Sequence, residues 1–222
     1  MGFDEGAASW DDDPARGERA RAVAAAMRRH LVAFRQAHDE TTGLPPRRAI
    51  DLGAGTGSLS LLLADLFDEI VLVDTSAGML EVAAAKVAAD PTLPARFETL
   101  RVDLASSDTP PIEPVEAAYS LLALHHIDDV GALLRGLHAL LMPGGLLLLA
   151  DLVTEDGSYH RHDADFHGHH GFDRDGLEAA LRAAGFEPLT YEIAATTRRR
   201  VDDGSERDYP LFLITARAER PR

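Results

Sequence analysis

Apolar residues near the start of the chain recur at the spacing of one helix face. These positions are Val23, Met27, Leu31 and Phe34. The spacing predicts a helix with one buried side. Asp13 and Pro14 come just before it; aspartate favours the capping position, and proline is tolerated at the first helical position. We therefore expect the helix to begin at Pro14 and to end before the turn-rich stretch Thr41–Pro46.

Strand-like and helix-like segments alternate from about residue 47 to residue 150. The predicted strands are Arg47–Asp51, Glu69–Asp74, Arg96–Asp103, Ala117–Leu124 and Leu146–Leu149, and the predicted helices are Ser58–Phe67, Ser76–Ala89 and Asp129–Leu141. This alternation is typical of a parallel sheet with crossover helices. We expect Pro143-Gly144-Gly145 to end the last of these helices, and the apolar run after it to be a central buried strand.

The pattern changes beyond residue 150. Residues 155–171 are polar and rich in histidine. A helix is expected next, capped by Asp173 and ended by Gly185. Two late strands complete a seven-stranded sheet as an antiparallel hairpin. They are Tyr191–Arg200 and Tyr209–Ala218, joined by the turn Asp202-Asp203-Gly204-Ser205.

Composition narrows the class of protein. The chain has 222 residues, 45% of them hydrophobic, which suits one folded α/β domain. With 22 basic and 37 acidic side chains the net charge is −15, so nucleic acid and anionic membranes are not expected partners. Cysteine is absent, which excludes disulfides, thiolate nucleophiles and cysteine-bound zinc. No apolar signal segment is visible in residues 1–13, so we expect a cytoplasmic location; the oligomeric state does not follow from the sequence.

The most informative motif is a strand that runs into three alternate glycines, Gly53, Gly55 and Gly57. Glycines permit a sharp turn and let a ligand approach the backbone, and the free N–H groups of the next helix suit a carboxylate or a nucleotide. Ser58 stands where the dinucleotide fingerprint requires a glycine, which counts against nicotinamide and flavin cofactors. Asp74 follows Gly53 by 21 residues, the spacing of a carboxylate that binds a ribose diol.

Five segments, in this order, resemble the motifs of class I S-adenosylmethionine-dependent methyltransferases of the small-molecule branch called type 11 or type 12. They are Asp51–Gly57, Val73–Leu80, Val102–Leu104, Ala123–Asp128 and Leu140–Gly145. The resemblance covers nearly the whole chain. It implies a Rossmann-like α/β fold: a seven-stranded, mostly parallel sheet with an antiparallel C-terminal hairpin and helices on both faces. It also implies methyl transfer to an oxygen, nitrogen or carbon nucleophile of a small molecule.

The resemblance further implies one domain in three parts. Residues 1–46 are an N-terminal lid segment and helix, 47–150 the cofactor-binding core, and 151–222 a substrate-side lobe, helix and hairpin. Phe3-Asp4 and Ala7–Asp11 resemble the opening segment that folds over the cofactor in this branch. Trp10, the single tryptophan, is expected in that lid; the alternatives are a disordered tail and simple packing on the first helix.

The expected cofactor is S-adenosylmethionine, and the resemblance assigns individual residues to its parts. By resemblance, Asp51 holds the methionine amino group, Asp74 accepts both ribose hydroxyls, and Asp103 accepts a hydrogen bond from the adenine amino group. The other expected contacts are Gly53, Ala54, Gly55, Thr56, Gly57, Thr75, Met79, Leu104 and Leu121. A core role for Met79 and a turn-capping role for Asp103 remain open alternatives.

Histidines supply the candidates for chemistry on the acceptor. The histidine-rich stretch contains His160, His162, His167, His169 and His170. His126, His167 and His170 are the catalytic candidates, since imidazole acts as a base near neutral pH. A solvated polar loop and a zinc or nickel site are the alternatives, but no helical His-Glu-x-x-His pair is present and we predict no metal. Of His125 and His126, one is expected to face the cleft and the other to pack.

Two other functions remain open at this stage. One is a nicotinamide-dependent oxidoreductase, disfavoured by Ser58 and by the late hairpin. The other is a non-catalytic protein on the same fold that binds S-adenosylmethionine or senses a metal. The run Arg198-Arg199-Arg200 lies in a predicted strand, where neighbours point to opposite faces, so it is interpreted as solvated surface.

Overall fold

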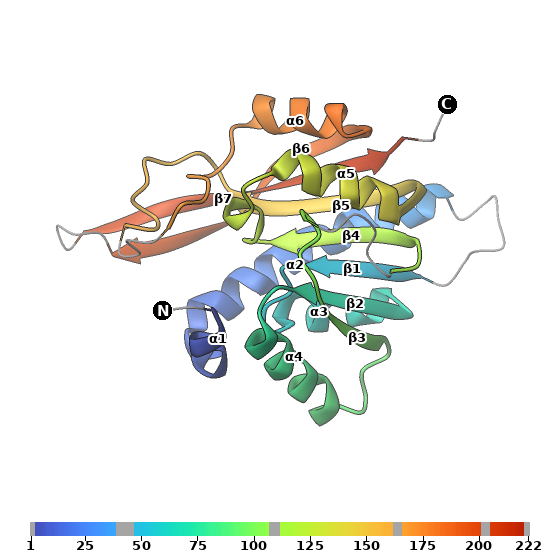
Figure 1. Cartoon of the computed structure of the whole chain (residues 1–222), viewed down its shortest axis with the longest axis horizontal. Helices are drawn as coiled ribbons and strands as arrows, with labels where there is room; N and C mark the ends of the chain where they lie inside the picture. The colour runs from blue at the N-terminus through green and yellow to red at the C-terminus, as the bar shows by residue number, and fades with distance from the viewer. Residues whose placement is uncertain (1–2, 39–46, 107–111, 162–165, 201–204, 220–222) are drawn as a thin grey trace.

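The computed structural model describes residues 3–38, 47–106, 112–161, 166–200 and 205–219, and its strands form one seven-stranded sheet (Figure 1). The strands are β1 (Arg48–Leu52), β2 (Glu69–Asp74), β3 (Arg96–Arg101), β4 (Val115–Leu121), β5 (Leu141–Leu152), β6 (Phe186–Arg200) and β7 (Glu206–Ala218). The helices are α1 (Phe3–Gly6), α2 (Pro14–His38), α3 (Ser58–Leu63), α4 (Ala77–Ala89), α5 (Val130–Leu140) and α6 (Arg174–Ala183), with 3-10 turns η1 (Ala7–Asp12), η2 (Ala64–Leu66) and η3 (Leu124–His126).

The strand order is β3-β2-β1-β4-β5-β7-β6. Pairings from β3 to β5 are parallel, and only β7 runs antiparallel to its two neighbours. The predicted fold class is therefore confirmed. The chain crosses the sheet in opposite directions on the two sides of the β1–β4 pair, and ligands bind such α/β sheets at the carboxyl ends of the strands beside this reversal.

Helices cover both faces of the sheet, as expected. Side chains alternate along each strand, so neighbouring residues enter different cores. Ala49 packs in a core with Met27 and Leu31 of α2, whereas Ile50 packs in a second core with Leu133 of α5 and Leu181 of α6. The two cores fix the sheet between the helices, and the strand ends carry the polar residues.

The predicted helix boundaries hold where a capping residue marks them. The Ala15 N–H donates to Asp13 Oδ1 at 3.0 Å, and α2 begins at Pro14. The Gly176 N–H donates to Asp173 Oδ1 at 2.8 Å at the start of α6. Gly185, with φ of +90°, follows the end of that helix.

The strand boundaries were less well predicted. β5 begins at Leu141 and includes Pro143-Gly144-Gly145, because the pairing jumps from Val115↔Leu141 to Ala117↔Leu146 across a bulge. The fourth strand ends at Leu121, so Leu124 lies in η3 rather than in the strand. β6 begins at Phe186, before the predicted Tyr191, and two register shifts along β6 break its alternation.

Three expected features lie wholly or largely outside the described residues. They are the break at Thr41–Pro46, His162 and the hairpin turn at 202–205, of which only Ser205 is described. Within the part of the chain that the structure covers, no helix combines the length and apolar content that crossing a bilayer requires.

Candidate cofactor and acceptor site

The glycine turn joins β1 to α3 at the reversal of strand order. Gly53, Gly55 and Gly57 all have positive φ, of 63°, 53° and 75°. A Cβ on Gly53 would lie 2.2 Å from the Ala123 Cβ, so packing against the end of β4 requires glycine there. A Cβ on Gly55 would meet no atom within 4 Å. The middle glycine therefore presents its backbone to open space that a ligand can occupy.

Asp74, the last residue of β2, points its carboxylate at this turn. Its Oδ2 accepts the Gly55 N–H at 2.8 Å, and its Oδ1 accepts the Ser76 N–H at 2.9 Å. Each carboxylate oxygen accepts more than one hydrogen bond. The half-buried carboxylate is therefore held in one orientation and retains acceptor capacity for a ligand's hydroxyl groups.

Asp51 is buried below the same turn and is 1% exposed. Burial raises its pKa to about 7, and the negative charge of Asp74 adds to the rise, while a hydrogen bond from Ser60 opposes it. The Ser60 hydroxyl donates to Asp51 Oδ2 at 2.7 Å and lies 2.7 Å from the Tyr119 hydroxyl. A cation brought close to Asp51 would favour its ionised form.

The remaining predicted cofactor residues lie at the same edge of the sheet. Leu121 ends β4, and Asp103 and Leu104 follow β3. Met79 and Leu104 are both buried, so the core alternative describes the position of Met79. Asp103 Oδ1 accepts the Ala105 N–H at 2.9 Å, so Asp103 also caps a turn.

The N-terminal segment packs on the turns that follow β1 and β2. Asp4 accepts the Ser76 hydroxyl at 2.5 Å and the Gly78 N–H at 2.9 Å, at the start of α4. Asp11 accepts the Thr56 hydroxyl at 2.9 Å in the glycine turn. These contacts hold α1 and η1 beside the predicted cofactor residues, and Figure 1 shows α1 next to α4.

Lys86 strengthens this attachment. Its ammonium lies 2.5 Å from Asp11 Oδ2 and donates to the Thr56 carbonyl at 3.0 Å. Partial burial opposes ionisation of Asp11, but hydrogen bonds from Lys86 and Thr56 outweigh it and lower the Asp11 pKa. Asp11 is thus a charged anchor at neutral pH.

Aromatic residues of the segment continue toward the histidines. The Phe3 and Trp10 ring centroids are 5.9 Å apart, and the Arg16 guanidinium covers the Trp10 ring at 3.8 Å. Phe3 also meets His126 edge to face at 5.2 Å. The segment therefore reaches from the glycine turn to His126 beyond β4.

Sequence reasoning missed one buried polar pair beside the site. His125 Nδ1 lies 2.6 Å from Asp151 Oδ1, and the two side chains are 2% and 0% exposed. Asp151 sits near the end of β5, within the apolar stretch Leu146–Leu152. A single carboxylate in an otherwise apolar strand could have revealed the pair, because a buried charge requires a partner.

The catalytic candidates occupy different surroundings. His126 follows β4 and contacts Phe3, whereas His170 pairs with Glu155 at 3.3 Å. Phe166 lies between these two histidines, with ring centroids 5.5 Å from His126 and 5.7 Å from His170. His167 is exposed. Of His125 and His126, the first packs inside and the second is exposed, as the expected division of roles requires.

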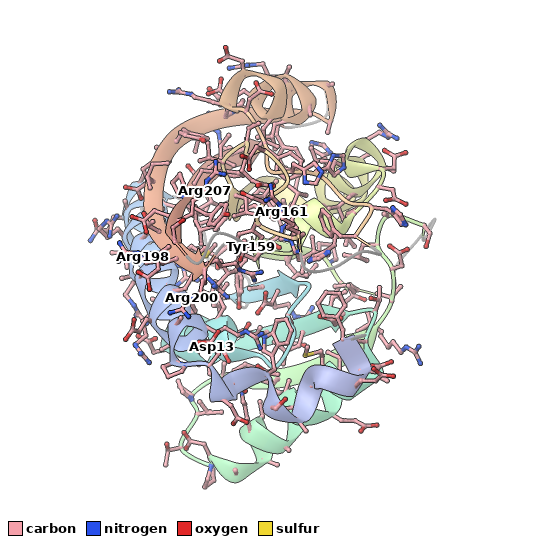
Figure 2. The ribbon with its side chains drawn as sticks, turned by 90° about the vertical axis from the view of Figure 1, so that its left-hand side faces the viewer. Asp13, Tyr159, Arg161, Arg198, Arg200 and Arg207 are labelled. Carbon is pink, nitrogen blue, oxygen red and sulfur yellow. The ribbon has the colours of Figure 1, made fainter. Side chains whose placement is uncertain are left out.

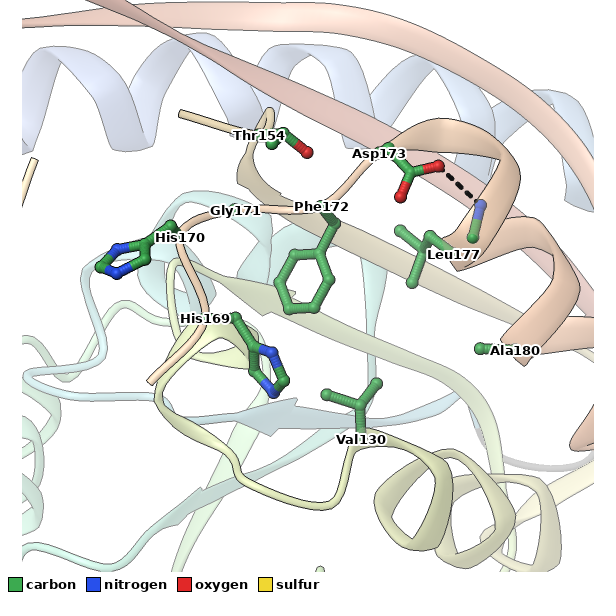
Figure 3. Close-up of a pocket in the computed structure, with 10 residues that line it drawn as sticks. Val130, Thr154, His169, His170, Gly171, Phe172, Asp173, Leu177 and Ala180 are labelled. Carbon is green, nitrogen blue, oxygen red and sulfur yellow. Dashed lines mark hydrogen bonds between the residues drawn. The ribbon is translucent and has the colours of Figure 1, made fainter. Parts of the chain in front are cut away.

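A separate pocket of about 440 Å³ opens between the starts of α5 and α6 (Figure 3). Val130, His169, Phe172 and Leu177 line it, together with other residues of the 169–173 loop. Figure 3 shows the His170 ring pointing away from the other lining side chains. None of the predicted cofactor residues lines this pocket, so it is distinct from the glycine turn.

The arginine run near the hairpin tip lies on the surface, as the sequence indicated. Arg198, Arg199 and Arg200 are all exposed. Arg198 pairs with Asp208 at 2.6 Å, while Arg199 covers the Tyr159 ring at 3.8 Å. Figure 2 shows Arg198 and Arg200 on the same side of the molecule as Tyr159.

A parallel sheet with this strand order and a glycine turn at its reversal defines a Rossmann-like cofactor-binding domain. Residues 18–191 match the sequence model of a methyltransferase domain. The chain belongs to this family of methyltransferase domains, which confirms the family resemblance.

Individual relatives match only about half of this chain. It is 31% identical over 109 residues to a malonyl-acyl-carrier-protein O-methyltransferase of Pseudescherichia vulneris, covering 49% of this chain and 40% of the relative. It is 37% identical over 105 residues to a trans-aconitate 2-methyltransferase of Methylobacterium radiotolerans, covering 46% of this chain and 36% of the relative. Each match thus spans well under half of the curated relative's length.

A solved structure extends the likeness in fold. An S-adenosylmethionine-dependent methyltransferase from Clostridium acetobutylicum superposes with a TM-score of 0.63, at 13% identity, over 86% of this chain and 90% of the other. At that identity the likeness supports the fold alone.

Proposed function

We propose that this protein transfers a methyl group from S-adenosylmethionine to an oxygen, nitrogen or carbon nucleophile of a small molecule. The observation that carries the proposal is the open space above Gly55 beside the fixed Asp74 carboxylate, in a chain of the methyltransferase domain family. The family match favours methyl transfer over the oxidoreductase alternative.

The residues around the glycine turn fit an amino-acid-bearing nucleoside. Asp74 offers two oriented oxygens for the ribose diol, and Asp51 offers a buried carboxylate for the methionine ammonium. Asp103 remains the proposed acceptor for the adenine amino group. When bound, the cofactor supplies an electrophilic sulfonium methyl.

The chain's own contribution is to hold the two reactants in line and to keep water away. Well-oriented reactants gain about 7 to 11 kcal/mol from positioning in favourable cases. In the proposed closed site, the N-terminal segment with Phe3 and Trp10 excludes water from the reacting atoms. Residues 47–150 bind the cofactor, and residues 151–222 contribute the acceptor side.

His126, His167 and His170 are the proposed groups that orient the acceptor or take its proton. Of these, His126 has the strongest support, because its ring contacts Phe3 of the segment that reaches the glycine turn. The net charge of −15 supports a small acceptor in place of nucleic acid. We also propose that the protein is cytoplasmic.

Calorimetric titration of an Asp74→Ala variant tests the cofactor assignment. Loss of an ionised acceptor for two hydroxyls is expected to weaken the affinity for S-adenosylhomocysteine by at least about tenfold. Asp175→Ala, which removes an exposed acid from the first turn of α6, is the matched control and should bind like the wild type. Unchanged affinity in Asp74→Ala would remove Asp74 from the site.

A further inference from the structure

Three imidazoles from two separate segments converge beside the carboxyl ends of β4 and β5. His125 and His126 belong to η3, and His160 comes from the chain beyond β5. One ring nitrogen from each lies within 4.8 Å of the others. The three residues are called the histidine group below.

The buried member of the group has one ring nitrogen already assigned. His125 Nδ1 lies 2.6 Å from Asp151 Oδ1, and the same carboxylate accepts the N–H groups of His125 and Leu152 at 3.2 and 2.7 Å. A carboxylate that receives the imidazole N–H fixes the ring orientation and raises the basicity of the other nitrogen. The lone pair of His125 Nε2 is therefore prepared to bind a cation.

Among the residues that the structure describes, none bonds the buried His125 Nε2. Leaving a buried polar atom unpaired destabilises a fold, so such an atom calls for an explanation, and a bound ion is one. The two other members of the histidine group lie next to it, with ring centroids 4.1 Å (His126) and 5.0 Å (His160) from the His125 ring. A metal ion shared by the three rings would supply the missing partner.

The backbone around the group is tightly packed. Phe166 stacks on the His160 ring at 3.9 Å, and the His169 N–H donates to the His125 carbonyl at 2.8 Å. A Cβ on Gly168 would lie 2.1 Å from that carbonyl oxygen, so only glycine allows this approach. The segment that carries the aromatic support is thus fixed against η3.

We propose that His125, His126 and His160 bind one divalent transition-metal ion of the zinc class, with Asp151 orienting His125. Imidazole nitrogens suit such ions, and three protein ligands leave a position open for an exogenous one. Ligands of tetrahedral zinc lie about 3.3 Å apart, so side-chain rotations that draw the rings together by roughly 1.5 Å complete the site.

The open position gives the ion a role on the acceptor, and this part rests on the proposed function. His126 contacts Phe3 of the N-terminal segment, and Asp11 of the same segment bonds Thr56 in the glycine turn. An ion there binds an acceptor oxygen, such as a hydroxyl or a carboxylate, and favours its deprotonated form. In this assignment His126 acts through the metal and is not itself the base.

Metal titration of untagged, chelator-treated protein tests the site without any methyl acceptor. We expect one equivalent of Zn²⁺ to bind in competition with a chromophoric chelator, and Co²⁺ to give the visible absorption of a low-coordinate imidazole site. His126→Gln and His160→Gln should each weaken Zn²⁺ binding at least about tenfold, and Asp151→Asn should weaken it about 10 to 100-fold.

Two controls separate this site from adventitious binding. His30→Gln lies on α2, where the His30 ring contacts Glu192 of β6, and His170→Gln lies outside the histidine group. Both variants should retain wild-type Zn²⁺ affinity. Sub-stoichiometric binding, or equal affinity in wild type and His160→Gln, would overturn the proposal. Binding of S-adenosylhomocysteine to the metal-free protein is measured separately, so failure of the metal site and failure of the proposed function are distinguishable.

Discussion

At the scale of single residues, two glycines of the turn have different tasks. One allows close packing, and the other leaves space for a ligand. Gly53 and Gly55 have nearly the same φ, yet only the first is pressed against another side chain, Ala123. Three alternate glycines in the sequence predicted the turn, but the distinct task of each depends on the end of β4. That information lies in the tertiary structure and not in the motif.

Alanine at Gly53 should cost more stability than alanine at Gly55, whereas alanine at Gly55 should mainly weaken ligand binding. Gly55→Ala adds only left-handed backbone strain, about 1 to 2 kcal/mol, but fills ligand space, so cofactor affinity should fall while the fold persists. Gly53→Ala adds overlap with Ala123, a further penalty of about 1 to 3 kcal/mol. Thermal unfolding and calorimetric titration of both variants check this; equal losses of stability would contradict the packing argument.

Asp51 gives a second residue-scale prediction, because its pKa is raised from 3.8 to about 7 in the folded protein. Between these values the unfolded chain loses the proton while the folded chain keeps it, so this group makes stability fall as pH rises. Below pH 3.8 both states are protonated and there is no penalty; above pH 7 the penalty is complete.

Asp51→Asn should therefore raise Tm at pH 8 and leave it unchanged near pH 4. Each pKa unit corresponds to about 1.4 kcal/mol, and each kcal/mol to roughly 2 to 4 °C in a chain of this size. Melting curves of both proteins across this range provide the measurement. A Tm difference that does not depend on pH would show that the Asp51 carboxyl group is not the cause.

At the scale of elements, the N-terminal segment is the part most open to a direct test. Asp4 and Asp11 attach it to the starts of α4 and α3. The partly exposed ion pair between Asp11 and Lys86 contributes about 1 kcal/mol or less. Such an attachment is weak enough to open and close around a ligand. Its capping contacts were not visible in the sequence, since they join residues more than 40 positions apart.

Trp10 reports on this segment alone, because the chain has no other tryptophan. Adding S-adenosylhomocysteine should change its fluorescence emission as the ring loses contact with water. Asp11→Asn removes the charge that faces Lys86 and should weaken cofactor affinity with little loss of stability. Emission that stays constant at saturating ligand would contradict the lid.

At the scale of the whole molecule, the sequence predicted the sheet and the strand ends that carry the proposed cofactor residues. Apolar periodicity and glycine punctuation report local structure, and they located most strands and helices. β5 was placed too late because proline and glycine were interpreted as a stop, whereas a bulge absorbs them. The histidine group and the His125–Asp151 pair were not predicted, because they depend on the pairing of β4 with β5 and on a long return of the chain.

We propose that residues at the carboxyl ends of β1, β2 and β4 bind an amino-acid-bearing nucleoside. A crystal structure of the protein grown with S-adenosylhomocysteine is the sharpest test. We expect the ribose hydroxyls to lie within hydrogen-bonding distance of Asp74 and the ligand to occupy the space above Gly55. A nucleoside bound instead in the pocket between α5 and α6, or a crevice that takes NADH and leaves S-adenosylhomocysteine in solution, would contradict it.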